Sequence, residues 1–242
     1  SELLPGVENL ISYLSENDYA FGFLSNNSTK TISDYIKKFQ SFGIKVTENQ
    51  VISAVQVTIE YLISLKEKIK TLYVIGESGL KKSLTQAKFN VVNEKTDEID
   101  AVIVGMDRNF NYRKLSIGLQ ACLQGARFIA TGIDPQFPTS NGFFPGAGSM
   151  VGALKSALNG QDPEMICGKP NPLIATRLLE KLKLDPKQVV LIGDRVSTDM
   201  QCAKNAKLSP VLIKTGFGKI EYRQYPNFPY YSVINSLFDV FV

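Results

Sequence analysis

The stretch "VLIGDRVSTDM" (190–200) joins an apolar run, a glycine and two acidic residues in direct succession. Its apolar run is short and continuous, as in the strands of parallel sheets, which are covered on both faces. Asp194 follows the glycine at once, and Asp199 lies within the next turn or helix start. Ligands of open parallel sheets bind beyond the carboxyl ends of the strands. The stretch therefore predicts a parallel sheet with carboxylates at its functional edge.

Further short apolar runs occur along the whole chain, and most end in glycine. They are YAFGFL (19–24), TLYVIG (71–76), DAVIVG (100–105), ARFIATG (126–132) and SPVLIKTG (209–216). Amphipathic segments lie between them at 31–42, 114–124 and 172–182, and a Pro- and Gly-rich stretch at 132–149 is expected to be irregular. Such alternation favours an α/β fold with helices on both faces of parallel sheets.

Composition limits the classes of protein to which the chain can belong. Its 242 residues are 44% hydrophobic, which suffices for one large domain or two modest ones. A net charge of +4 without basic runs does not indicate nucleic acid or a membrane surface as partner. We find no apolar span, no signal-peptide pattern and only three scattered cysteines. A reduced, cytoplasmic protein is expected.

The chain contains no histidine. A Ser-His-Asp triad, a Cys-His pair and a zinc site with imidazole ligands are therefore excluded within it. Acid–base chemistry has to come from carboxylates, lysine, tyrosine or a metal-bound water.

Two other strand ends carry groups that suit a phosphate. "FLSNNST" (23–29) places the hydroxyl and amides of Ser25, Asn26 and Asn27 at a predicted helix start, where N–H groups and the helix dipole favour anions. "ICGKPNP" (166–172) holds Lys169 in a tight turn before another helix, where it can bring a point charge to a phosphate. Each stretch alone has an ordinary explanation, a polar helix cap for the first and a solvated lysine for the second.

The two acids of the opening stretch suit a metal ion. Mg²⁺ takes one or two carboxylates together with waters and substrate oxygens, and Asp194 and Asp199 repel each other unless a cation relieves them. The alternative is structural, with Asp194 capping the next helix and Asp199 paired with Arg195 or a lysine. Together, the three strand ends contain the groups that phosphoryl transfer requires.

The order of these motifs resembles a known family. "LSNNST" (24–29), "GKP" (168–170) and "IGDRVSTD" (192–199) are similar to motifs two, three and four of the haloacid dehalogenase (HAD) superfamily. Segments such as "VIGESGL" (74–80) and "PGAGSMVGAL" (145–154) resemble the large cap of its NagD-like, p-nitrophenylphosphatase branch, a type IIA cap. The likeness extends from Leu4 onward in the same order.

The resemblance implies a Rossmann-like parallel-sheet core formed by 1–70 and 166–242, with an α/β cap domain inserted at 71–165. It implies Mg²⁺ as cofactor and a small phosphorylated metabolite as partner, with neither nucleic acid nor membrane. The cap would set the substrate, which the sequence leaves open, and a homodimer through the cap is compatible with the resemblance.

The resemblance also implies roles for individual residues. Ser25, Asn26 and Asn27 would hold the phosphate, and Lys169 would be the catalytic lysine that neutralises phosphate and nucleophile. Asp194 and Asp199 would form the metal site, the second ordering the ion through water or a neighbouring contact. In the cap, Thr131 and Asp134 would face the substrate, although "TGID" (131–134) has glycine where the branch usually has asparagine.

The family's first motif, Asp-x-Asp-Gly-(Val/Thr), does not occur in the printed sequence. In the family, its first aspartate attacks phosphorus and its second protonates the leaving group. Ser25 cannot replace this nucleophile because no histidine is available to activate it. The chain is either a fragment of a protein that carries the motif or a protein that lacks it. The three retained motifs favour the fragment.

Two functions therefore compete. The first is a Mg²⁺-dependent phosphatase that hydrolyses small phosphomonoesters through an aspartyl-phosphate, its nucleophile lying in a missing N-terminal segment. The chain as printed would then be inactive. The second is a catalytically dead, HAD-like module that binds a phosphate ligand or another partner.

Overall fold

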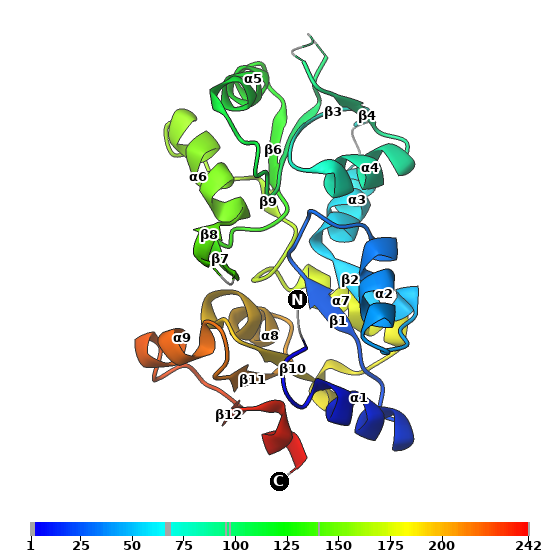
Figure 1. Cartoon of the computed structure of the whole chain (residues 1–242). Helices are drawn as coiled ribbons and strands as arrows, with labels where there is room; N and C mark the ends of the chain where they lie inside the picture. The colour runs from blue at the N-terminus through cyan, green and yellow to red at the C-terminus, as the bar shows by residue number, and fades with distance from the viewer. Residues whose placement is uncertain (1–2, 66–68, 95, 97, 140, 242) are drawn as a thin grey trace. The chain divides into compact units, whose positions relative to one another are not determined.

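The computed structural model describes residues 3–65, 69–94, 96, 98–139 and 141–241 (Figure 1). The chain divides into two compact units. The first consists of Ser1–Leu24, Ser33–Ile52 and Lys169–Val242, and the second of Ser25–Ile32 and Ser53–Gly168. The assignment of 1–70 and 166–242 to a core and of 71–165 to a cap stays a prediction.

Helices and strands alternate along the chain, as the sequence predicts. The α-helices are α1 (Val7–Glu16), α2 (Ile32–Ser41), α3 (Ala54–Ser64), α4 (Ser78–Gln86), α5 (Tyr112–Leu123), α6 (Ala147–Ala157), α7 (Leu173–Leu182), α8 (Gln201–Asn205) and α9 (Gly218–Gln224). The strands are β1 (Phe23–Ser25), β2 (Val51–Ser53), β3 (Thr71–Ile75), β4 (Asn90–Val92), β5 (Ala101–Val104), β6 (Arg127–Ala130), β7 (Gln136–Thr139), β8 (Gly142–Pro145), β9 (Met165–Ile166), β10 (Val190–Gly193), β11 (Ser209–Ile213) and β12 (Ser232–Ile234). Short helical turns are η1 (Glu48–Gln50), η2 (Pro186–Gln188), η3 (Val196–Met200) and η4 (Leu237–Phe241).

The second unit is built on a five-stranded sheet with the order β4-β3-β5-β6-β9. Every neighbouring pair in this sheet is parallel. All four residues of β5 are buried, as expected for a central strand covered on both faces. Figure 1 shows α5 and α6 on one side of the sheet and α4 on the other. The predicted α/β class with parallel sheets is confirmed.

Alternate residues of the central strands form one side of the hydrophobic core. Val102 and Val104 of β5 point to the same face and pack with Leu154 of α6. Leu154 is fully buried, and on the other face the α4 residues Leu80 and Leu84 are fully buried as well. The helix periodicity and the strand alternation of the sequence thus agree on one core.

The strands of the first unit form separate sheets. β10, β11 and β12 make a parallel three-stranded sheet, and β1 and β2 make a two-stranded sheet. A small cluster of Val211, Ile213, Ile234 and Leu237 packs under the first of these. Within the described ranges, no helix has both the length and the apolar character to cross a bilayer.

Two predictions about local structure are wrong. The strand expected at 19–24 covers only Phe23–Ser25, because its partner β2 offers just Val51–Ser53 for pairing. The stretch expected to be irregular at 132–149 contains the antiparallel hairpin β7–β8 and the start of α6. Proline is tolerated in this hairpin because a two-stranded sheet has only edge strands.

Leu154→Ala is expected to lower the free energy of unfolding by about 2–5 kcal/mol, because it leaves a cavity in the core of the second unit. Leu123, at the end of α5, is 67% exposed and serves as the matched control. Leu123→Ala should change stability by less than about 0.5 kcal/mol. Urea denaturation measures both, and equal losses would contradict the position of Leu154 in the core.

Candidate active site

The predicted site residues occur in both compact units. Lys169, Asp194 and Asp199 belong to the first unit. The segment Ser25–Ile32 and the predicted cap residues Thr131 and Asp134 belong to the second. Each of these two groups has its own local geometry.

Lys169 and Asp199 form a largely buried ion pair. The Nζ of Lys169 donates to Oδ1 of Asp199 at 2.5 Å, and the two side chains are 14% and 9% exposed. The other oxygen of Asp199 accepts the backbone N–H of Arg195 at 3.1 Å. Both carboxylate oxygens therefore have donors. The structural alternative for Asp199 in the sequence analysis, an ion pair with a lysine, is present. A metal role for Asp199 stays a prediction.

Asp194 lies directly beyond the end of β10. Its Oδ2 accepts the backbone N–H of Phe217 at 3.1 Å. Gly216 has a φ of +48°, and a Cβ there would lie 2.3 Å from the same oxygen. Glycine is therefore required at this turn for steric and conformational reasons.

The pKa of Asp194 is raised by its burial and by the charge of Asp199, against the lowering effects of the Phe217 N–H and Arg195. A raised pKa in the folded state means that the protonated group stabilises the fold below its unfolded pKa. This contribution is lost as the pH rises through the folded pKa. Above its folded pKa the ionised Asp194 therefore opposes folding, and a nearby cation would offset that cost.

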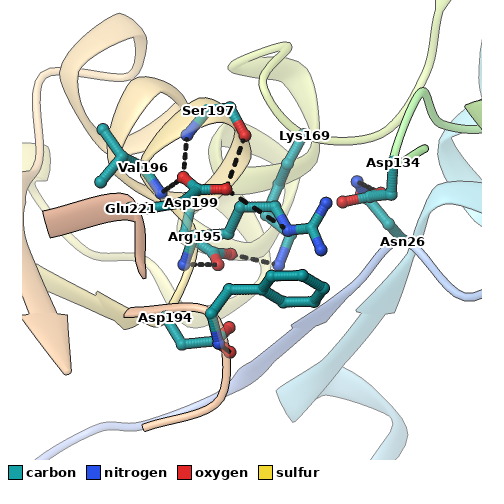
Figure 2. A network of polar contacts seen from close by, with 10 residues as sticks. Asn26, Asp134, Lys169, Asp194, Arg195, Val196, Ser197, Asp199 and Glu221 are labelled. Atoms are coloured by element: carbon teal, nitrogen blue, oxygen red, sulfur yellow. Dashed lines mark hydrogen bonds and ion pairs between the residues drawn. The ribbon is translucent and has the colours of Figure 1, made fainter. Parts of the chain in front are cut away.

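Glu221 of α9 binds the segment between Asp194 and Asp199 (Figure 2). Its Oε2 accepts the backbone N–H groups of Val196 at 2.5 Å and Ser197 at 3.0 Å, at the start of the π-helical turn η3. A carboxylate there satisfies otherwise unpaired N–H groups and complements the helix dipole. Arg195 lies over the Phe217 ring at 3.7 Å and 3.9 Å from Glu221.

The arrangement around Asp194 fits Mg²⁺ as a site with one protein carboxylate. Within the described part of the chain, no group of three or more His, Cys, Asp or Glu side chains could hold a metal. Mg²⁺ does not need such a cage, because it commonly keeps several waters and uses one or two carboxylates with substrate oxygens. The Asp194 carboxylate is partly buried and its pKa is raised, so a bound cation would stabilise its charged form.

In the second unit, the loop that follows β1 is closed by its own side chains. Ser25 Oγ accepts the N–H of Asn27 at 3.2 Å. Asn27 Oδ1 accepts the N–H and the hydroxyl of Thr29, at 2.9 and 2.8 Å. These bonds hold the predicted phosphate ligands in a defined turn.

Asp134 and Thr131, the predicted substrate residues of the cap, differ from each other in their surroundings. Asp134 Oδ2 accepts a hydrogen bond from Asn26 Nδ2 at 2.8 Å, so a predicted substrate residue and a predicted phosphate ligand are in contact. Figure 2 shows these two side chains facing one another. Thr131 is fully buried, and its Oγ1 has no hydrogen-bond partner among the described residues. The substrate contacts of Thr131 and Asp134 stay predictions.

Sequence reasoning missed Glu221 and the backbone N–H of Phe217. Both belong to "GFGKIE" (216–221), which follows β11 and reads as an ordinary loop. A signal existed, because β11 is the parallel neighbour of β10. The ends of neighbouring parallel strands meet at one edge of a sheet, so residues after one strand lie near those after the other.

The ends of the chain match two family profiles. Residues 1–90 match the family described as haloacid dehalogenase-like hydrolase. Residues 166–240 match a second profile, described as HAD-hydrolase-like. Together these ranges contain Ser25, Asn26, Lys169, Asp194 and Asp199.

Several similar proteins are phosphatases by name. The chain is 33% identical over 226 residues to an acid sugar phosphatase of Staphylococcus epidermidis, covering 93% of this chain and 85% of that protein. Its structure matches that of a p-nitrophenyl phosphatase from Archaeoglobus fulgidus with a TM-score of 0.86 and 32% identity, covering 97% and 90% of the two chains. A glycerol phosphate phosphatase from Mycobacterium tuberculosis in complex with calcium matches with a TM-score of 0.83 and 25% identity, covering 96% of this chain and 68% of that one.

Asp199→Asn is expected to lower the free energy of unfolding by about 3–5 kcal/mol, because it leaves the ammonium of Lys169 buried without its counter-charge. Asp162 offers a matched control, since its ion pair with Lys155 is largely exposed at 74% and 42%. Asp162→Asn should cost less than about 1 kcal/mol. Chemical denaturation compares the two, and a similar small effect at both positions would contradict a buried pair.

Proposed function

The chain belongs to the haloacid dehalogenase-like hydrolases, and on that premise we propose that it is a Mg²⁺-dependent phosphatase of small phosphomonoesters. The observation that carries the proposal is the buried ion pair of Lys169 and Asp199 beside the carboxylate of Asp194. A lysine fixed in this way offers a charge that is already desolvated and needs no reorganisation when a phosphate arrives.

The net charge of the site in the first unit favours binding of a cation over binding of a phosphate alone. Lys169 and Arg195 are positive, whereas Asp194, Asp199 and Glu221 are acidic, so with all groups ionised the set has one negative charge in excess. One divalent ion would turn this into one positive charge, the sign that a phosphate needs. When bound, Mg²⁺ would offset the charge on the phosphoryl oxygens.

In this proposal the chain's own residues orient the ester. Lys169 supplies a positive charge to the phosphate, and Asp199 holds the ammonium in place. Ser25 and Asn26 supply hydroxyl and amide donors from the turn after β1. Asp194 keeps a carboxylate directed at the cation, held by the Phe217 N–H.

We further propose that the attacking carboxylate precedes Ser1. No Asp-x-Asp occurs in the printed sequence. In the first unit β10 and β1 are outer strands of separate sheets, each with one strand neighbour among the described residues. An added strand could pair with either edge and cover backbone groups that otherwise invite aggregation. Such a strand would bring its end to the same carboxyl edge as Asp194.

The lack of an Asp-x-Asp in the printed sequence also supports a second function. Without an Asp-x-Asp or a histidine, the printed chain could bind phosphate esters and Mg²⁺ without turnover. Calorimetry with inorganic phosphate and MgCl₂ distinguishes this module from an enzyme when paired with an assay of p-nitrophenyl phosphate hydrolysis. Because a matching relative is an acid sugar phosphatase, sugar phosphates are the first natural esters to test.

Lys169→Ala is expected to lower kcat/KM for p-nitrophenyl phosphate by at least about 100-fold in the protein that includes its preceding residues, because the charge that offsets the phosphate is lost. Lys155→Ala, which removes a lysine of the exposed pair, should leave the rate unchanged. A Lys169→Ala protein with undiminished activity would show that this lysine has no part in the reaction.

MgCl₂ is expected to stabilise the protein through Asp194. At about 100 times its dissociation constant the ion should add about 2.7 kcal/mol to the free energy of unfolding, and EDTA should remove the gain. Asp194→Asn should abolish this response, whereas Asp162→Asn should retain it, since that carboxylate is exposed and distant in sequence. Urea denaturation at pH 8 measures the effect. An unaltered response in Asp194→Asn would place the ion elsewhere.

A further inference from the structure

The loop with the predicted phosphate ligands is attached to the five-stranded sheet of the second unit. Residues Ser25–Ile32 group with Ser53–Gly168, although Leu24 and Ser33 on either side of them group with the first unit. This change of unit over eight residues indicates that the loop has contacts of its own with the sheet. Ser28 contacts the end of a strand of this sheet, and Thr29 lies against α4.

Ser28 binds the end of a central strand. Its side chain is 1% exposed, and its Oγ accepts the backbone N–H of Met106 at 3.1 Å. Met106 follows β5 after Gly105, whose own N–H donates to Ile75 O of β3 at 2.8 Å. The hydroxyl thus continues the backbone hydrogen bonding of the sheet by one further step. A buried N–H group without such an acceptor costs appreciable free energy.

Two glycines let the loop approach this closely. A Cβ on Gly105 would lie 2.6 Å from Ser28 Oγ. A Cβ on Gly79, in the first turn of α4, would lie 2.2 Å from the carbonyl oxygen of Thr29. The atom met at Gly79 belongs to the backbone, so rotation of a side chain cannot relieve the overlap. Any side chain at Gly79 would force α4 and the loop apart.

We propose that this sheet positions the phosphate loop, with Ser28 as the positioning residue and Gly79 as the contact that sets its distance. The inference rests on the proposed function, since it concerns the same phosphate. Ser28 is three residues from Ser25 and two from Asn26. Fixing Ser28 on β5 therefore fixes the turn from which those donors point, and donors that are already oriented bind an anion more tightly.

The test compares the printed chain with Gly79→Ala, Ser28→Ala and Gly152→Ala. Gly152 is the matched control, because it is also a helical glycine of the second unit but a Cβ there would meet nothing within 4 Å. Alanine favours both helices by itself. An effect seen at Gly79 and not at Gly152 therefore reports the contact with the loop and not helix propensity.

Two readouts separate this inference from the proposed function. Hydrogen exchange, followed by mass spectrometry on peptides that span 25–32, should be about tenfold faster in Gly79→Ala and Ser28→Ala, with the peptides of β3 unchanged. The dissociation constant for inorganic phosphate with MgCl₂, measured by calorimetry, should rise about tenfold in both. Gly152→Ala should match the parent chain in both measurements.

Parent-like exchange and parent-like phosphate affinity in Ser28→Ala would overturn the positioning role while the proposed function stands. Failure of the parent chain to bind phosphate would overturn both proposals. Ser28→Ala removes one oxygen and adds no bulk, so it decides the question if Gly79→Ala does not fold.

Discussion

A lysine and an aspartate that are both largely removed from water have to balance each other's charge. Lys169 and Asp199 do so at 2.5 Å, and the geometry of the first unit's site depends on this pair. Because Asp199 is engaged by the lysine and by the Arg195 N–H, the proposed cation is assigned to Asp194. The pair also fixes the position of the Lys169 ammonium, which the proposed function assigns to the phosphate.

The turn around this pair is held by contacts from α9. Glu221 accepts the first N–H groups of η3, and Phe217 supplies both an N–H to Asp194 and a ring to Arg195. Gly216 permits the close approach. The site of the first unit is therefore assembled by two parallel strand ends, after β10 and after β11, rather than by the aspartate motif alone.

The parts of the structure that could be predicted from sequence are those with a local cause. Continuous apolar runs ending in glycine predicted β3, β5, β6, β10 and β11, because burial on both faces leaves that pattern in the residues themselves. The strand at 19–24 was too long in the prediction because strand length depends on a partner. The hairpin β7–β8 was missed because its prolines argue against strands unless the sheet has only edges.

Contacts between residues distant in sequence explain what the sequence could not predict. The bonds from Ser28 to Met106 and from Asn26 to Asp134 join residues 78 and 108 positions apart, and nothing local marks either pair. Gly79 stands in "VIGESGL" (74–80), for which the sequence offered only a resemblance to the family's cap. Its structural reason, contact with the backbone of Thr29, is visible only in the fold.

The most direct test of the central claim is a crystal structure of the chain with MgCl₂ and inorganic phosphate. One phosphate is expected within hydrogen-bond distance of Lys169 Nζ, with the metal ion bound to Asp194. A phosphate bound away from Lys169, or a metal ion that does not contact Asp194, would contradict it.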